Sequence, residues 1–364
     1  MSGPLTGLKI VELAGLGPTA FAAMMLADHG AEVIRVERPG SRPADRDPLL
    51  RSRKIMTADL KSAAGLETVR ALVCEADGFI EGFRPGTTER LGLGPDDMLR
   101  DNPKLVYGRL TGWGQDGPIA QSAGHDINYI ALTGALHAIG TARQPVPPLA
   151  LLGDFAGGST MLAFGMVSAM LHAGRTGQGQ VVDCAMMDGA NVLMTIFHGL
   201  MAAGYWEDRR EANIVDGAAH WYGVYETLDN RFISIASMEP QFYALLLDRL
   251  GLADDPEFVR TEDWQAQRND KAHWPKLRRR LADIFRTRTR AEWCDLLENT
   301  DVCFAPVLSM EEAPHHPHAQ AREAFITVNG VVQPAPAPRY SVTKVAPPRP
   351  PVAWDEQEAR TKIE

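Results

Sequence analysis

The sequence predicts an α/β protein with a doubly wound sheet in its first part and a smaller second domain behind it. Three observations support this prediction: strand and helix patterns alternate up to residue 205, a hairpin pattern appears after residue 220, and prolines crowd the last segment. Alternating strands and helices are typical of a parallel sheet with helices on both faces. The chain has 364 residues, 45% of them hydrophobic, which is enough for a large core and a smaller one.

The first elements form a β-α-β unit. Residues 8–14 are typical of a buried strand, 18–27 of a helix with Pro18 in its first turn, and 32–36 of the next strand. Further strand patterns, separated by helical stretches, follow at 78–81, 105–110 and 181–184. In such sheets ligands bind beyond the carboxyl ends of the strands, so we expect the functional residues there.

The second domain begins with a hairpin. Two alternating runs within 220–235 flank Asp229-Asn230, helical patterns cover 241–250 and 274–285, and 302–307 leads the chain back. From Gln333 onward, prolines exclude helix and predict an extended tail. We therefore expect a large domain (1–205), a linker (206–219), a small domain (220–312), and a return segment with a C-terminal tail packed on the large domain (313–364).

Bulk composition argues against several classes of protein. The net charge of -9 does not suit a nucleic-acid partner, because phosphate binding needs a basic surface. The four cysteines lack C-x-x-C spacing, which indicates reduced thiols rather than disulfides or a zinc site. No signal-peptide pattern and no apolar run of about 18 residues is evident. We expect a soluble cytoplasmic protein without a metal or a membrane partner.

A local basic region follows the first glycine-rich turn. Gly15 and Gly17, with Glu37 twenty residues later, mimic a dinucleotide fingerprint, but Arg38 follows at once, and residues 35–61 hold eight basic and four acidic residues. A phosphorylated ligand other than a redox cofactor is therefore expected. The better candidates lie beyond predicted strands or near helix starts: Arg38, Lys61, Arg84 and Arg90. Four others could equally form a solvated loop face: Arg42, Arg46, Arg51 and Arg53.

Three short segments place an ionisable side chain beside Gly, Pro or a helix start, where backbone amides can face a ligand. They contain His125 (GHDINY, 124–129), Asp154 (LGDFAG, 152–157) and Glu239 (MEPQFY, 238–243). The three side chains suit proton transfer next to a developing negative charge. Plainer interpretations remain open: a structural histidine, an N-capping aspartate and an ordinary glutamate at a helix start.

Ordered motifs along nearly the whole chain resemble the class III CoA-transferase superfamily and, within it, the bacterial α-methylacyl-CoA racemases. Besides the three segments above, they are residues 8–14, 36–39 (VERP), 57–61 (TADLK), 82–86 (GFRPG) and 89–92 (ERLG). The resemblance implies a large Rossmann-like domain, a smaller α+β domain and an interlocked homodimer. It also implies an acyl-CoA thioester substrate and no separate cofactor, since CoA is part of the substrate.

The resemblance also implies roles for single residues. His125 with Glu239 would act on the (S) thioester and Asp154 on the (R) thioester, while Asp126 would contribute its backbone amide and hydrogen bonding. The positions that would hold CoA and substrate are Arg38, Ala58, Asp59, Leu60, Lys61, Gly82, Phe83, Arg84, Arg90, Gly124, Ile127, Asn128 and Tyr129. A carboxylate is a weak base in water, so we infer that an apolar pocket raises the basicity of Asp154.

Other interpretations stay open. A CoA-transferase would use Asp154 as a nucleophile, but it needs no second proton base such as His125. A catalytically silent acyl-CoA-binding subunit would keep Arg38 and Lys61 without the acid/base set, and a dehydrogenase would need a hydride site that the sequence does not offer. The cluster His315, His316 and His318 resembles a metal site but suits a solvated turn. Four methionines suit core or interface packing, and the resemblance implies that they could instead form a surface for the acyl chain: Met186, Met187, Met194 and Met201.

Overall fold

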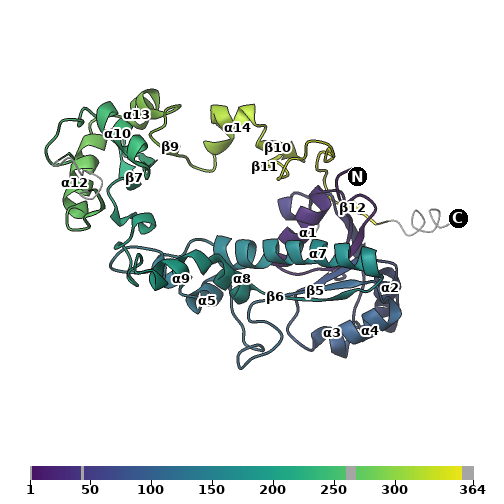
Figure 1. Ribbon diagram of the computed structural model, residues 1–364. Helices are drawn as coiled ribbons and strands as arrows, with labels where there is room; N and C mark the ends of the chain where they lie inside the picture. The colour runs from purple at the N-terminus through teal and green to yellow at the C-terminus, as the bar shows by residue number, and fades with distance from the viewer. Residues whose placement is uncertain (1, 42–44, 260–267, 355–364) are drawn as a thin grey trace. The chain divides into compact units, whose positions relative to one another are not determined.

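The computed structural model describes residues 2–41, 45–259 and 268–354, and the chain divides into two compact units (Figure 1). Unit 1 comprises Met1–Ala135, Pro148–Thr195 and Ala321–Glu364, and unit 2 comprises Leu136–Pro147 and Ile196–Gln320. The sequence-based boundaries lay at 205, 219 and 312. In the observed division unit 2 also takes in Leu136–Pro147 and residues 196–205, which were expected in the large domain, as well as the expected linker 206–219 and residues 313–320.

Unit 1 is built on a seven-stranded sheet in the order β12-β3-β2-β1-β4-β5-β6, and all of its strand pairs are parallel. Its strands are β1 (Lys9–Leu13), β2 (Glu32–Glu37), β3 (Lys54–Thr57), β4 (Gly78–Glu81), β5 (Val106–Thr111), β6 (Gln180–Ala185) and β12 (Val352–Ala353). The predicted parallel sheet is confirmed, and β3 and β12 are additions to it. The strand order reverses between β1 and β4, which is where open α/β sheets bind ligands.

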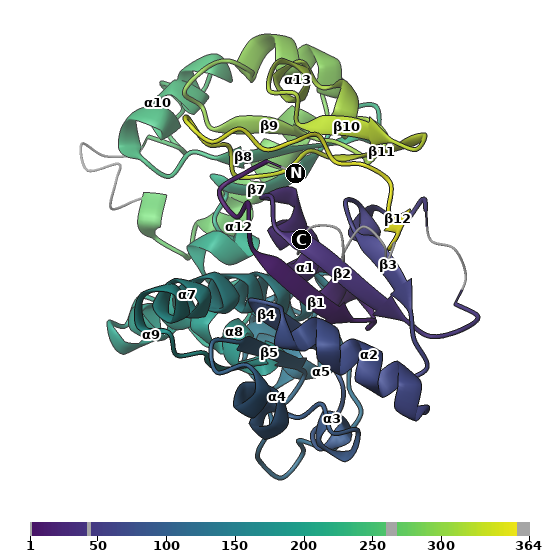
Figure 2. The same ribbon diagram turned by 90° about the vertical axis from the view of Figure 1, so that its right-hand side faces the viewer.

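Helices cover both faces of this sheet (Figure 2), which explains the near-continuous apolar strands. On β1, Ile10 packs in the core that includes α1 and α7, while Val11 packs in the core that includes α2 and α4. The helices of this part of the chain are α1 (Gly17–Asp28), the 3-10 turn η1 (Pro48–Leu50), α2 (Ala63–Cys74), α3 (Thr87–Arg90), α4 (Pro95–Asp101), α5 (Asp126–Ala131), α6 (Ala135–Ala138), the π-helix η2 (Leu151–Thr160), α7 (Met161–Thr176), α8 (Met186–Leu193) and α9 (Thr195–Ala202).

Several basic residues of the 35–61 region are buried in ion pairs. Arg35 and Arg53 both pair with Glu12, and Arg51 pairs with Asp28 and donates to the Pro334 carbonyl at 2.7 Å. The interpretation of Arg51 and Arg53 as a solvated loop face is therefore wrong, because these side chains are 4% and 0% exposed. Lys54 pairs with Glu32, so half of the eight basic residues are neutralised within the fold. Arg42 lies outside the described residues.

One helical segment is long and apolar. Leu151–Thr176 meets the length and composition of a membrane span, contrary to the expectation that no such run exists. No other helix of residues 2–41, 45–259 and 268–354 meets these criteria. One side of it packs in the unit 1 core, where Leu162 and Met166 are fully buried, while Phe164 and Leu171 on the same helix are exposed.

Unit 2 contains a three-stranded antiparallel sheet of β7 (Tyr222–Glu226), β8 (Phe232–Ala236) and β9 (Phe304–Val307). The predicted hairpin is present, and Asn230 adopts a left-handed φ of 55° in its turn. Trp221, Tyr243 and Phe285 are among the buried side chains of the core. Besides most of α6 and α9, named above, its helices are η3 (Ile214–Ala218, a π-turn), α10 (Pro240–Arg249), α12 (Trp274–Phe285), α13 (Arg290–Leu297), the 3-10 turn η4 (Ala313–His315) and α14 (Pro317–Ala321).

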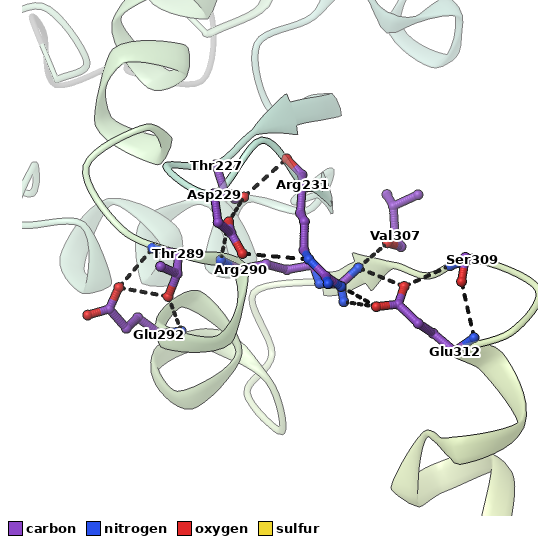
Figure 3. A network of polar contacts seen from close by, with 9 residues as sticks. All are labelled: Thr227, Asp229, Arg231, Thr289, Arg290, Glu292, Val307, Ser309 and Glu312. Carbon is purple, nitrogen blue, oxygen red and sulfur yellow. Dashed lines mark hydrogen bonds and ion pairs between the residues drawn. The ribbon is translucent and has the colours of Figure 1, made fainter.

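A network of charged side chains ties the hairpin of unit 2 to the segment after β9 (Figure 3). Glu312 accepts hydrogen bonds from Arg231 and Arg290, and its Oε2 also accepts the Ser309 N–H at 2.9 Å. Arg290 donates further to the Val307 carbonyl at 2.7 Å. These donors, Arg290 first among them, lower the pKa of Glu312 to about 2.

The return segment packs within unit 1. Strands β10 (Phe325–Val328) and β11 (Val331–Pro334) form an antiparallel hairpin, and the described chain from 335 to 354 contains no helix, as its prolines predicted. Near its end β12 joins the sheet edge beside β3. The hydrogen bonds from Arg51 to Gln333 and Pro334 fix the hairpin to the large sheet.

Candidate active site

The carboxyl ends of β2, β3 and β4 carry the residues expected to hold a phosphorylated ligand. Arg38 directly follows β2, Ala58–Lys61 follow β3, and Gly82–Arg84 follow β4. Arg90 ends the short helix α3. Parallel strands present these ends on one edge of the sheet, so the fold gathers a set that is scattered along the chain.

Three cations of this edge are available to a ligand. Arg38, Lys61 and Arg84 are exposed, and none of them forms an ion pair within the described part of the chain. The turn after β4 also packs closely on α1: a Cβ at Gly82 would lie 2.7 Å from the Thr19 methyl group, so a larger residue would displace this turn. The edge thus offers unpaired positive charge, which suits a ligand that carries phosphate groups.

A buried ion-pair network shapes the loop after β4. Glu81 accepts the Phe83 N–H at 2.7 Å and the Arg109 Nε–H at 2.9 Å, and Arg109 also donates to Glu89 at 2.8 Å. Burial raises the pKa of Glu81, while these donors oppose the rise. The sequence analysis missed Arg109. The sequence did offer one indication of it, a charged residue within an otherwise apolar strand. The structure places this residue directly opposite Glu81 in the register of β4 and β5.

Asp154 lies in the π-helix η2, which continues into α7. The backbone of this segment packs directly on α8: a Cβ at Gly157 would lie 2.7 Å from the Ala190 nitrogen, and a Cβ at Gly189 would collide with the Gly157 carbonyl. The Ser159 hydroxyl lies 2.8 Å from both the Asp154 and the Pro18 carbonyl oxygens. π-Helical turns are frequent at functional sites, and here close glycine contacts hold one in place.

His125 forms the N-cap of α5, and its backbone N–H donates to the Asn128 side chain at 3.1 Å. The Tyr129 hydroxyl donates to the Gly124 carbonyl, and the Tyr129 ring packs edge-on against Trp113 at 4.9 Å between ring centroids. Tyr129 is buried, so it fixes the turn that presents the exposed His125. In the first turn of α5 the Asn128 N–H donates to the His125 carbonyl at 2.7 Å, whereas the described residues offer no acceptor to the N–H groups of Asp126 and Ile127, which are available to an oxygen of a ligand.

Asp126 connects the His125 turn to the Asp154 segment. Its Oδ1 accepts the backbone N–H groups of Gly153 at 2.6 Å and of Asp154 at 2.8 Å. Burial, followed by the charge of Asp126, raises the pKa of Asp154 to about 6, and His125 opposes this rise. The direction is the one that a base working near neutral pH requires.

Glu239 belongs to unit 2, where it forms the N-cap of α10. The structure therefore brings His125, Asp126 and Asp154 together in unit 1 and presents Glu239 on the other unit. Arg268, which the sequence analysis missed, donates to the Met238 carbonyl at 2.6 Å and stacks over the Trp221 ring at 4.7 Å. These contacts fix the turn that carries Glu239.

No group of three or more potential ligands for a metal exists among residues 2–41, 45–259 and 268–354. In the histidine cluster, His316 instead pairs with Glu298 at 2.9 Å. Of the four methionines considered for packing or for an acyl surface, Met186 and Met187 contribute to the unit 1 core.

Comparisons with known proteins agree on one family. The family model CoA-transferase family III matches residues 5–361. The alpha-methylacyl-CoA racemase of Mus musculus is 44% identical over 345 residues, which cover 94% of this chain and 88% of that protein. The racemase of Homo sapiens is 43% identical over 94% of this chain and 88% of its own length. A CAIB/BAIF family protein from Brucella suis, 24% identical, has the same fold with a TM-score of 0.83 over all of both chains.

The contact between the Asp154 segment and α8 can be tested with two glycines. Gly189→Ala should lower the free energy of unfolding by about 2 kcal/mol or more, because the new methyl group forces the two backbones apart. Turnover should fall with it, since Asp154 moves with its helix. Urea unfolding and initial rates measure both effects.

The matched control is Gly174→Ala on α7, where a Cβ meets nothing within 4 Å. This change should stabilise the protein by up to about 1 kcal/mol through helix propensity. Equal effects of the two substitutions would show that the glycine contact does not matter.

Proposed function

This chain belongs to CoA-transferase family III, and we propose that it is an α-methylacyl-CoA racemase that interconverts (R)- and (S)-2-methylacyl-CoA thioesters. The observation that carries the proposal is the pairing of the exposed His125 with a half-buried Asp154 whose pKa lies near 6. Racemisation needs two bases on opposite faces of one carbon, and imidazole and carboxylate groups are the kinds of side chain that serve as such bases.

The proposed reaction proceeds through an enolate. Asp154 removes the α-proton of the (R) thioester: the C–H bond breaks, an O–H bond forms on the carboxylate, and the electron pair moves to the thioester oxygen. Backbone N–H groups at the start of α5 donate to this oxygen and stabilise its charge. Protonated His125 then returns a proton to the opposite face, which gives the (S) thioester. The reverse reaction begins at His125.

Glu239 is assigned the role of orienting the His125 ring and stabilising its protonated form. The motif that contains it, residues 238–243, supports this assignment. CoA is assigned to the strand edge of unit 1, where Arg38, Lys61 and Arg84 meet its phosphates. The protein is proposed to work in the cytoplasm without a metal or a separate cofactor.

A homodimer is proposed as the working form. An apolar row on α7 supports it, because Phe164 is 72% exposed, Leu171 is 55% exposed, and Val167 lies between them on the same helix face. Interlocked protomers can separate only by unfolding, so dissociation and loss of helical signal should coincide in a denaturant series. Folded monomers recovered on dilution would contradict the interlocked arrangement.

The rival activity is transfer of CoA between carboxylic acids, in which Asp154 would attack the thioester and form an anhydride.

The two activities differ in the substrates that they consume. In heavy water, one pure enantiomer of a 2-methylacyl-CoA should gain deuterium at its α-carbon and form the other enantiomer, with no free acid present. Turnover that appears only when a carboxylic acid is added would establish the transferase instead. Mass spectrometry and chiral chromatography provide the readout.

The CoA site can be tested through the Michaelis constant. Arg38→Ala and Lys61→Ala should each raise KM about tenfold for every acyl-CoA alike, with little change in kcat, because phosphate contacts bind ground state and transition state equally. Lys104→Ala is the control, since this exposed lysine precedes β5 at the opposite end of the strands. A loss confined to one acyl chain would remove Arg38 and Lys61 from the nucleotide site.

A further inference from the structure

The two oxygens of the buried Asp126 carboxylate differ in their hydrogen bonds. The residue is 5% exposed, and its Oδ1 accepts both the Gly153 and the Asp154 N–H groups. Its Oδ2 is buried and has no hydrogen-bond partner among the described residues. A Cβ at Gly153 would lie 2.8 Å from Oδ1, so glycine is needed for the carboxylate to reach this position.

Holding the two N–H groups does not require a charge. Asparagine and serine satisfy first-turn amides about as well as aspartate does. An unpaired carboxylate in a buried place is unfavourable unless something offsets it, and the two N–H donors only partly do so. An effect of this carboxylate beyond fixing the backbone is therefore to be sought in the groups around it.

The charge of Asp126 raises the pKa of Asp154, after burial, and it also contributes to the raised pKa of Tyr129. The groups on α5 and its N-cap that face Asp154 are His125, Asp126 and Tyr129, and the Tyr129 hydroxyl is engaged with the Gly124 carbonyl. Charged groups on the other packed elements are either ion-paired elsewhere or exposed: Asp28 on α1, Arg109 on β5, Asp183 on β6 and Asp188 on α8. Asp126 is thus the negative charge that opposes ionisation of Asp154.

We propose that the Asp126 carboxylate sets the strength of Asp154 as a base, and so acts as a charge-setting and positioning residue for one face of the reaction. The inference rests on the racemase function proposed above. A nearby negative charge makes the Asp154 carboxylate hold a proton more firmly, which favours removal of the α-proton from the (R) thioester. Asp126 itself takes no proton from the substrate.

The direct test is Asp126→Asn, which keeps an oxygen acceptor and removes the charge. The pKa of Asp154 should then fall from about 6 towards its ordinary value. Deuterium uptake from the (R) thioester needs ionised Asp154, so the acid limb of its pH profile should move to lower pH by about one unit. The plateau rate should fall because the base is weaker. Uptake from the (S) thioester begins at His125, and its acid limb should move less.

Two further variants serve as a control and as a second uncharged form. Asp96→Asn removes an equal charge from the first turn of α4, where Asp96 is exposed, and should leave both profiles unchanged. Asp126→Ser retains a capping oxygen without charge and without a buried amide nitrogen, and it should reproduce the shift if the asparagine variant does not fold. An unshifted (R) profile in a folded, uncharged variant, or equal shifts for both enantiomers, would overturn the inference.

A second measurement does not depend on activity. Carbodiimides modify protonated carboxyl groups, so the pH dependence of Asp154 labelling, followed by peptide mass spectrometry, reports its ionisation. The midpoint should lie near 6 in the wild-type protein and lower in both Asp126 variants. A wild-type midpoint near the ordinary aspartate value would contradict the inference. Absence of deuterium uptake in the wild-type protein, with the labelling shift intact, would instead contradict only the racemase function.

Discussion

The candidate site depends on one junction: the buried Asp126 carboxylate, which accepts the N–H groups of Gly153 and Asp154. This junction joins two segments 27 residues apart and places the Asp154 segment beside the His125 turn. Glycines make it possible. Gly153 leaves room for the carboxylate, and the contact of Gly157 with α8 prevents the Asp154 helix from moving away. Because the interior is close-packed, a single methyl group added at this junction is expected to displace Asp154.

Charge is used in two distinct ways in unit 1. Arg35, Arg51 and Arg53 are buried and ion-paired, and they hold strands and the return hairpin in register. Arg38 and Lys61, only a few residues away, remain exposed at the strand ends. The net charge of residues 35–61 cannot distinguish the buried arginines from the exposed cations. The difference depends on whether each side chain meets an acidic partner in the folded chain. The ion pairs with Glu12 and Asp28 form only when distant strands and helices come together.

Periodicity predicted the regular parts of the fold well, since strands buried on both faces show continuous apolar runs and the α10 and α12 patterns are helical. It missed β3, which is four residues long and has polar ends, and β12, which is two residues long. It also missed the apolar length of Leu151–Thr176, because glycines and Asp154 interrupt the pattern. Motifs identified His125, Asp154 and Glu239 as candidates. The bond from Asp126 to the Asp154 segment is a tertiary contact that no local pattern encodes.

The central claim is that His125 and Asp154 act as separate bases on opposite faces of one carbon. Its most direct test is solvent deuterium uptake, measured for each pure enantiomer with His125→Ala and with Asp154→Ala. The account predicts that His125→Ala retains uptake from the (R) thioester and Asp154→Ala retains it from the (S) thioester, although both lose net interconversion, because abstraction needs only the base on its own side. Equal loss of uptake from both enantiomers in both variants would contradict the account and favour one shared base or a nucleophilic Asp154.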